Sequence, residues 1–275
     1  MIFQKKFWQE LYYHFTHDDV AGWAAQLSYF FLLSLFPFLI FLLTLIGYLP
    51  ITEDVLFNIL NQYVPDDSMA LIHSTINELT VNRNGKLLSF SLIGMFWAAS
   101  NGVNALMRVF NRAYEIEENR SFIATRLISF GLTISVLLVI PVALVLPVFG
   151  RLLGEYVFSL LGISDTFIQF WEMMRWVISF LIIAFVLTIL FVVAPNKKIK
   201  VIHAFPGAII ATLGWQLTSL AFSYYVENIS NYSATYGSLG AIIALMIWFY
   251  ISGVMIIIGC IVNAILIRHN RRLFF

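Results

Sequence analysis

The feature that most constrains this chain is a set of six stretches without a single Asp, Glu, Lys or Arg. They cover residues 20–52, 87–107, 127–150, 176–196, 201–226 and 228–267. A helix needs about 20 apolar residues to cross the roughly 30 Å of bilayer hydrocarbon, and only helices or closed barrels satisfy their backbone hydrogen bonds there. A barrel would show short alternating segments instead. The sequence therefore predicts an all-α, polytopic membrane protein with six transmembrane helices.

The composition agrees with this prediction, because 60% of the residues are hydrophobic and only 11% are charged. Soluble domains carry about 25% charged residues. The first stretch is expected to end near Leu49 and Pro50, and the last to begin after the polar residues 228–237. We expect a single transmembrane domain over residues 1–275, with helices at 20–49, 87–107, 127–150, 176–195, 203–226 and 238–267.

The distribution of basic residues predicts the orientation. Twelve of the 16 Lys and Arg residues lie before the first stretch, between residues 108 and 126, between 197 and 200, and after residue 267. Basic residues near helix ends are retained in the cytosol, where they face anionic headgroups. We therefore expect both termini in the cytosol, with this charge serving orientation in preference to an anionic-ligand site.

Two longer segments are expected on the outer side. Thr52 can cap a helix with Glu53 and Asp54 in its first turn, within a segment that covers 52–80. Residues 152–172 are rich in Phe, Leu and Ile and sparsely charged, as in a helix that lies in the membrane interface. Both read as external amphipathic segments, and the pattern does not distinguish a cap over the bundle from a gate.

Uncharged polar residues mark the inner halves of several predicted helices. Those of the second helix follow the spacing i, i+3, i+7 and i+10, which puts them on one helical face. Such groups avoid lipid and face the bundle interior. One hypothesis is a polar, cytosol-facing cavity that binds a substrate; the alternative is interhelical hydrogen bonding, worth about 0.6 kcal/mol each. The candidates are Gln26, Tyr29, Asn101, Asn104, Arg108, Asn111, Gln216 and Asn263.

Nothing in the sequence predicts an enzyme. No nucleophile elbow, phosphate-binding glycine loop or HExxH motif occurs. His14 and His17, followed by Asp18 and Asp19, have metal-like spacing, but a closed site needs about four ligands and a solvated segment explains them better. We expect no metal, no cofactor and no nucleic acid partner, since the inner cations are spread over four short segments.

Four separated motifs resemble one protein family. They are AAQLSYFFLLSLFPFLI, SNGVNALMRVFNRAYE, PNKKIK and YGSLGAIIALMIWFY, in this order along nearly the whole chain. The chain resembles the YihY/BrkB family of bacterial inner-membrane proteins. The resemblance implies a six-helix plasma-membrane protein, with suggested links to envelope lipid or solute export and to virulence. An older ribonuclease label of that family finds no hydrolytic residues here.

The resemblance carries over to individual positions. Tyr236 matches a family motif and joins the candidate substrate-binding residues on that ground. Two positions depart from the family pattern: many relatives carry an acid where this chain has Gln216 and Ile261. If those acids couple ions, this protein cannot use the same coupling.

Two functions from different classes remain at the level of sequence. The first is a transporter or lipid-translocating protein, with membrane lipids and a lipid or small-molecule substrate as partners. The absence of a convincing inverted repeat weakens it. The second is a non-transporting scaffold for assembly of the cell envelope. The sequence leaves the substrate and the oligomeric state open.

Overall fold

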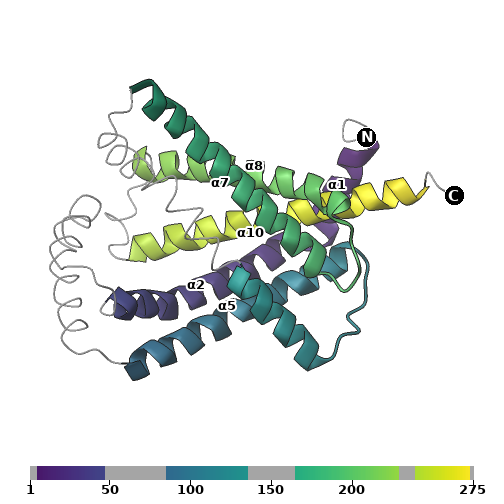
Figure 1. Ribbon diagram of the computed structural model, residues 1–275. Coiled ribbons are helices and arrows are strands. Elements are labelled where there is room, and N and C mark those ends of the chain that lie inside the picture. The colour runs from purple at the N-terminus through teal and green to yellow at the C-terminus, as the bar shows by residue number, and fades with distance from the viewer. Residues whose placement is uncertain (1–4, 47–84, 136–164, 229–238, 273–275) are drawn as a thin grey trace. The chain divides into compact units, whose positions relative to one another are not determined.

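A computed structural model describes residues 5–46, 85–135, 165–228 and 239–272 (Figure 1). Every regular element in these ranges is a helix, which confirms the all-α prediction for the described part of the chain. The helices are α1 (Lys5–His17), α2 (Val20–Ile46), α5 (Gly85–Ala113), the short helix Phe122–Ser135, α7 (Asp165–Val193), α8 (Val201–Asn228) and α10 (Leu239–Arg272). The predicted outer segment 52–80 and most of 152–172 lie outside the described residues.

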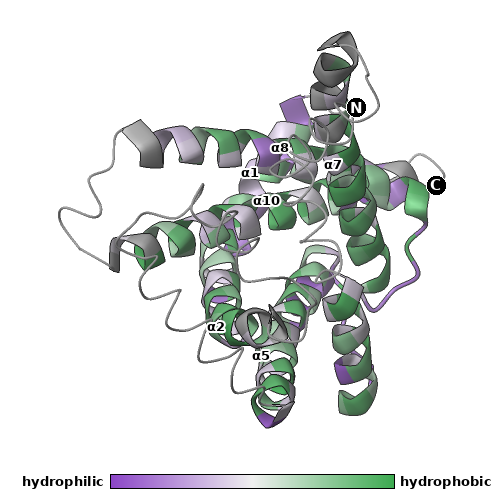
Figure 2. Ribbon diagram, turned by 60° about the vertical axis from the view of Figure 1, so that its left-hand side comes forward, coloured by the Kyte–Doolittle hydropathy of each residue, from purple (hydrophilic) through white to green (hydrophobic). Residues whose placement is uncertain are grey.

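Within the described residues, four helical stretches are long and apolar enough to cross a membrane: Val20–Phe41, Trp176–Val193, Val201–Tyr225 and Ile242–His269. The helices are hydrophobic along most of their length (Figure 2). Large apolar side chains on several of them face outward, among them Phe90 at 77%, Leu217 at 66% and Phe185 at 66% exposure. Water would penalise such a surface, whereas lipid accepts it. The chain is therefore a multi-pass membrane protein.

Two of the six expected spans are not among these four stretches. α5 contains the predicted span 87–107, but Asn101, Asn104 and Arg108 lower the mean hydropathy of its second half. The predicted span 127–150 is described only as far as residue 135, within the helix Phe122–Ser135. The total of six spans stays a prediction.

The chain forms two compact units. Unit 1 comprises Met1–Tyr29 and Ser100–Phe275, and unit 2 comprises Phe30–Ala99. In unit 2 the second part of α2 packs against the first part of α5: a Cβ added to Gly94 would lie 3.6 Å from Cβ of Pro37. This is ordinary van der Waals contact, so the two segments pack closely beside the proline. All further contacts described below lie within unit 1.

The most closely packed helix pair in unit 1 is α8 and α10. A Cβ on Gly207 would overlap the carbonyl oxygen of Gly259, and a Cβ on Gly259 would lie 2.6 Å from the carbonyl oxygen of Gly207 and 2.7 Å from Cβ of Ala211. Small residues at such a crossing let two backbones approach closely, which is how helices in lipid gain van der Waals contact. The crossing therefore requires glycine at both positions.

Polar side chains join the same two helices at successive levels. Nε1 of Trp215 donates to Oγ of Ser252 at 2.9 Å, and Nε1 of Trp248 donates to Oγ of Ser219 at 3.1 Å. The two indole rings lie 5.9 Å apart. Buried indole N–H groups need an acceptor, and each serine supplies one from the facing helix. These pairs set the register of α8 against α10.

A two-residue turn separates α1 from α2. Asp19 has a φ of 52°, in the left-handed region, and its carboxylate accepts a hydrogen bond from the backbone N of Gly22 at 3.2 Å. An aspartate at this position caps the first turn of a helix and satisfies one of its free N–H groups. The cap explains why α2 begins at Val20.

The glycine crossing yields a stability prediction. Replacing Gly259 by Ala should destabilise the protein by about 1–3 kcal/mol, because the new methyl group forces the two backbones apart. The midpoint temperature of unfolding in detergent should fall. The matched control is Gly131→Ala, where an added Cβ meets no atom within 4 Å. Equal midpoint temperatures for the two variants would show that the close crossing contributes nothing.

Candidate functional site

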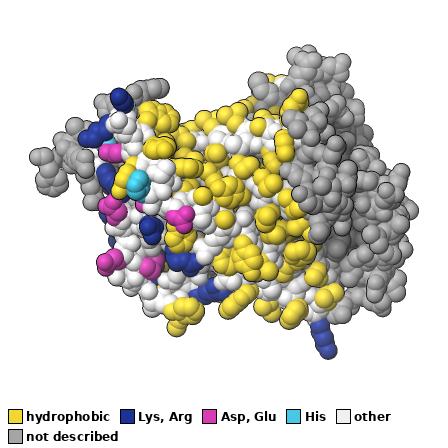
Figure 3. Space-filling view, turned by 180° about the vertical axis from the view of Figure 1, so that it is seen from behind, with side chains coloured by type: hydrophobic (Ala, Val, Ile, Leu, Met, Phe, Trp, Pro, Cys, Tyr) yellow, Lys and Arg dark blue, Asp and Glu magenta, His cyan; other side chains and the backbone are white. Residues whose placement is uncertain are grey.

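Four basic segments of the chain meet at one end of unit 1. Arg120 binds the residues that follow α7, and Arg268 of α10 binds both α1 and the residue that ends α5. We call this region the basic end; its cations are Lys5, Lys6, Arg112, Arg120, Lys197, Lys198, Lys200 and Arg268. Charged side chains gather in the same way at one side of the face drawn in Figure 3, next to a hydrophobic surface. The side of the membrane that the basic end faces stays a prediction.

Arg120 closes the C-terminal end of α7. Its Nη1 donates to the carbonyl oxygen of Ala194 at 3.1 Å, and its Nη2 donates to that of Pro195 at 2.7 Å. The last carbonyls of a helix have no partners within the helix and carry partial negative charge, so a guanidinium there satisfies both demands. The interaction fixes the turn after α7 to the segment after α5.

Asn111 makes a second connection between the same two segments. Its Oδ1 accepts from the backbone N of Asn196 at 2.7 Å, and its Nδ2 donates to Oε2 of Glu118 at 2.7 Å. Asn196 in turn donates through Nδ2 to the carbonyl oxygen of Glu117 at 3.2 Å. Asn111 is only 4% exposed, so its amide holds the turn in a single arrangement.

A groove of about 440 Å³ lies at this turn after α7. Its lining combines three cations, Arg120, Lys197 and Lys198, with apolar side chains. The apolar part consists of Val192, Val193, Pro195 and Ile199, and Asn196 completes the lining. Lys197 and Lys198 are exposed, whereas Arg120 is partly buried and held by carbonyl groups. Such a groove can bind an anion that carries an apolar group.

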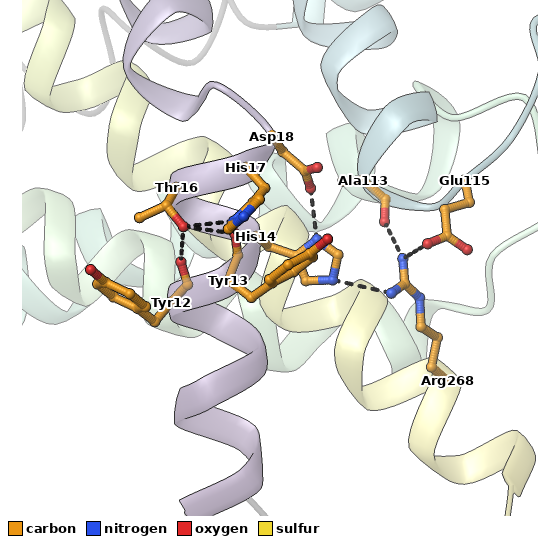
Figure 4. A network of polar contacts seen from close by, with 9 residues as sticks. All are labelled: Tyr12, Tyr13, His14, Thr16, His17, Asp18, Ala113, Glu115 and Arg268. Carbon is orange, nitrogen blue, oxygen red and sulfur yellow. Dashed lines mark hydrogen bonds and ion pairs between the residues drawn. The ribbon is translucent and has the colours of Figure 1, made fainter.

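A second network surrounds Arg268 (Figure 4). Its Nη1 donates to Nε2 of His14 at 3.1 Å, and its Nη2 lies 2.9 Å from Oε1 of Glu115 and donates to the carbonyl oxygen of Ala113 at 3.2 Å. Since arginine cannot accept, Nε2 of His14 must be the acceptor, and Nδ1 then donates to Oδ2 of Asp18 at 2.7 Å. The network ties α1 and the end of α5 to α10.

His14 and His17, at the turn before α2, make hydrogen-bond contacts within the protein. His14 is occupied by Asp18 and Arg268, and Nδ1 of His17 lies within hydrogen-bonding distance of Thr16 and of the carbonyl oxygen of Tyr13. Among the residues that the structure describes, no three His, Cys, Asp or Glu side chains come together as a metal site requires.

The polar cavity that the sequence predicts stays a prediction, and a second hollow at the basic end is narrow. A cleft of about 10 Å³ separates the start of α2, the end of α5 and α10, and it is lined by Asp18, Trp23, Val109, Arg112, Ile257 and Ile261, with Val20 and Ala113. This is about the volume that one water molecule needs. Neither this cleft nor the basic groove is lined by a residue of the predicted substrate-binding set.

Two asparagines of that set contact the helix Phe122–Ser135. Oδ1 of Asn101 accepts from Nη1 of Arg126 at 2.8 Å, and Oδ1 of Asn104 accepts from Oγ of Ser129 at 3.0 Å. The guanidinium of Arg126 also lies over the ring of Phe130, 5.2 Å from its centre. The two asparagines therefore share a helical face, as their spacing indicates, and that face is used for interhelical hydrogen bonds.

Asn263 is fully buried between α8 and α10. Its Oδ1 accepts from the backbone N of Gly207 at 2.7 Å, and its Nδ2 donates to the carbonyl oxygen of Ala204 at 2.8 Å. These two hydrogen bonds engage both the oxygen and the nitrogen of the amide, on either side of Pro206 in α8. Asn263 and Asn111 thus act as interhelical or interloop connections.

The other predicted residues occupy varied positions. Gln26 is partly buried, and its Oε1 is buried without a hydrogen-bond partner. Gln216 is partly exposed, while Tyr29 and Arg108 are exposed. Tyr236 lies outside the described residues. Substrate binding by this set stays a prediction.

The groove contains functional candidates whose charge, in the sequence, indicates membrane orientation alone. Lys197 and Lys198 belong to the PNKKIK motif, and their charge was the available signal. Arg120 lies 74 residues before its acceptor Ala194 in the sequence. No local pattern reveals a contact over that separation.

Comparisons with known proteins agree on one family. A family model described as virulence factor BrkB matches residues 11–273. The ribonuclease-like protein YfkH of Bacillus subtilis (strain 168) is 50% identical over 266 residues, which are 97% of this chain and 96% of that protein. UPF0761 membrane proteins of Vibrio vulnificus and Coxiella burnetii are 27% and 26% identical, over 91% and 93% of this chain and 79% and 91% of their own lengths. No solved structure matches the chain.

The hydrogen bond between Asn111 and the turn after α7 yields a second prediction. Asn111→Ala leaves the backbone N–H of Asn196 without its acceptor in a part-buried position, which costs about 1–3 kcal/mol. The midpoint temperature of unfolding should fall. Asn119→Ala, in the same segment, is the control, because Asn119 is exposed. An Asn111 variant as stable as the Asn119 variant would show that this hydrogen bond does not stabilise the protein.

Proposed function

Because the chain belongs to the virulence factor BrkB family, we propose that it is a bacterial plasma-membrane protein that takes up and translocates an amphiphile with an anionic headgroup. Both termini and the basic end lie in the cytosol in this proposal, in keeping with the positive-inside rule. The observation that carries it is the groove at the turn after α7, whose lining holds both three cations and several apolar side chains.

The groove suits a phospholipid-like molecule in both charge and position. Arg120, Lys197 and Lys198 offer charge-assisted hydrogen bonds to a phosphate, while Val192 and Val193 offer apolar contact to the first part of an acyl chain. The stretch Trp176–Val193 is long and apolar enough to cross the membrane, so its end lies at headgroup level. A soluble anion would use the cations alone and leave the apolar wall empty.

Translocation needs a polar path beyond the groove. The candidate path follows the polar residues Gln26 of α2 and Gln216 of α8, both of which are partly buried. Oε1 of Gln26 is buried without a donor, which is a position that a substrate hydroxyl or a water can fill. The 10 Å³ cleft at the basic end is closed to a headgroup, so movement requires that α2 and α5 separate from α10. Alternating access around this path is the mechanism proposed.

A scaffold for assembly of the cell envelope is the second candidate. Hydrogen bonds of Asn101, Asn104, Asn111 and Asn263 to neighbouring segments favour it, because amides used in this way stabilise a static bundle. A scaffold would bind envelope proteins through its exposed surfaces and would move no lipid. Neither candidate function includes a catalytic step. The term ribonuclease-like is part of the name of YfkH and describes that protein.

Lipid movement in reconstituted vesicles distinguishes the two candidates. Protein in phosphatidylcholine vesicles should accelerate the transfer of a fluorescent phosphatidylglycerol between leaflets, measured by quenching of the outer leaflet with dithionite. The double variant Lys197→Gln/Lys198→Gln should slow this transfer several-fold, because the headgroup loses two cationic contacts. Lys200→Gln is the control, since Lys200 is exposed beside the groove and outside its lining.

Three further results would decide against the proposal. Transfer no faster than in protein-free vesicles would rule out this activity and leave the scaffold. Equal transfer of phosphatidylcholine and phosphatidylglycerol would remove the role of the cations. A Lys200 variant as slow as the double variant would assign the effect to general surface charge.

A further inference from the structure

We propose that α1 is a membrane-interface helix whose aromatic face, formed by Trp8, Tyr12 and Phe15, inserts into a leaflet of anionic phospholipid at the basic end. Lys5 and Lys6 contact the phosphates of that leaflet in this arrangement. The inference is independent of lipid translocation, because a scaffold could use the same helix.

The aromatic face is continuous and exposed. Trp8, Tyr12 and Phe15 have the spacing i, i+4 and i+7, which places them in one narrow stripe of a helix. Their exposures are 56%, 71% and 40%. A water-facing helix gains nothing from such a stripe, whereas the headgroup region accepts rings with one apolar and one polar end, as Trp and Tyr have.

The opposite side of α1 is turned toward α10. Phe7 is buried at 3% exposure, and the carboxylate of Glu10 lies 3.6 Å from Nδ1 of His269. His14 accepts from Arg268 of α10 one turn beyond. One side of α1 therefore contacts α10, and its aromatic face is exposed.

The charges of α1 are sorted between these two sides. Glu10 lies beside His269 of α10, and Asp18, directly after α1, accepts a hydrogen bond from His14, so both carboxylates have partners within the protein. Lys5 and Lys6 are exposed. Exposed cations beside an aromatic stripe are typical of helices that bind anionic lipid, and each cation near such a surface adds attraction.

The position of α1 along the chain sets its depth in the membrane. Only Asp18 and Asp19 separate it from the stretch Val20–Phe41, and its partner Arg268 lies at the end of the stretch Ile242–His269. Both stretches are candidates to cross the bilayer. A helix fixed to the ends of two spans lies at the level of the headgroups, where its exposed face meets lipid.

Adjacent residues on different sides of α1 provide matched probes. In a Cys260→Ala background, which removes the single native cysteine, a nitroxide is attached at Trp8→Cys or Tyr12→Cys and, as controls, at Gln9→Cys or Tyr13→Cys. All four positions are exposed, so the labels should not disturb folding. The full chain is placed in vesicles of equal phosphatidylcholine and phosphatidylglycerol, and collisions with oxygen and with a water-soluble nickel chelate are measured.

Labels at positions 8 and 12 should collide mainly with oxygen, which concentrates in lipid, and those at 9 and 13 mainly with the nickel chelate. Lys5→Gln/Lys6→Gln should reduce the difference in the anionic vesicles and leave it unchanged in pure phosphatidylcholine. The proposal is wrong if positions 12 and 13 give the same ratio of collisions. Protection of position 12 from both reagents, with dipolar broadening between labels, would instead show that a second copy of the chain covers the face.

Discussion

Bilayer hydrocarbon contains no water to hydrogen-bond a polar group, and the described part of this protein is organised around that constraint. Helices satisfy their backbone hydrogen bonds internally, but side-chain amides and indoles must find hydrogen-bond partners on neighbouring segments. Asn263 meets both a donor and an acceptor of α8, and two tryptophans of α8 and α10 each meet a serine across the crossing. The polar side chains therefore specify which faces of the helices meet.

At the basic end the same requirement is met by charged groups. Arg120 binds carbonyl groups after α7, and Arg268 binds the carbonyl that ends α5 together with His14 of α1. Each guanidinium joins segments far apart in the sequence, and a planar fork of donors suits several carbonyl oxygens at once. The consequence is a loop region joined by several hydrogen bonds, in which Lys197 and Lys198 are exposed in the same groove as apolar side chains. The proposed headgroup site rests on this combination of cations and apolar side chains.

Much of the helical framework could be predicted from charge-free runs, and the ends of the helices could not. The run from residue 20 matches the start of α2 because the capping aspartate stands directly before it. α7 begins at Asp165, well before the charge-free run at 176, since a helix continues beyond the hydrocarbon wherever its local sequence allows. α10 likewise extends to Arg272. Charge patterns report the bilayer boundary, and helix ends depend on caps and packing.

The candidate site was predictable only in part. The spacing of Asn101 and Asn104 correctly indicated a shared face, because helical periodicity is a local property. Their partners Arg126 and Ser129, and the contact between Asn111 and Asn196, depend on tertiary packing that one sequence does not encode in any short pattern. Lys197 and Lys198 were visible as charge, but their combination with Arg120 required the fold.

Selection of an anionic headgroup by the basic groove can be measured by native mass spectrometry of the protein released from nanodiscs with equal phosphatidylglycerol and phosphatidylcholine. Phosphatidylglycerol should be retained on the wild-type chain and lost from the variant lacking the Lys197 and Lys198 charges. Equal retention of both lipids, or retention that is unchanged in that variant, would contradict it.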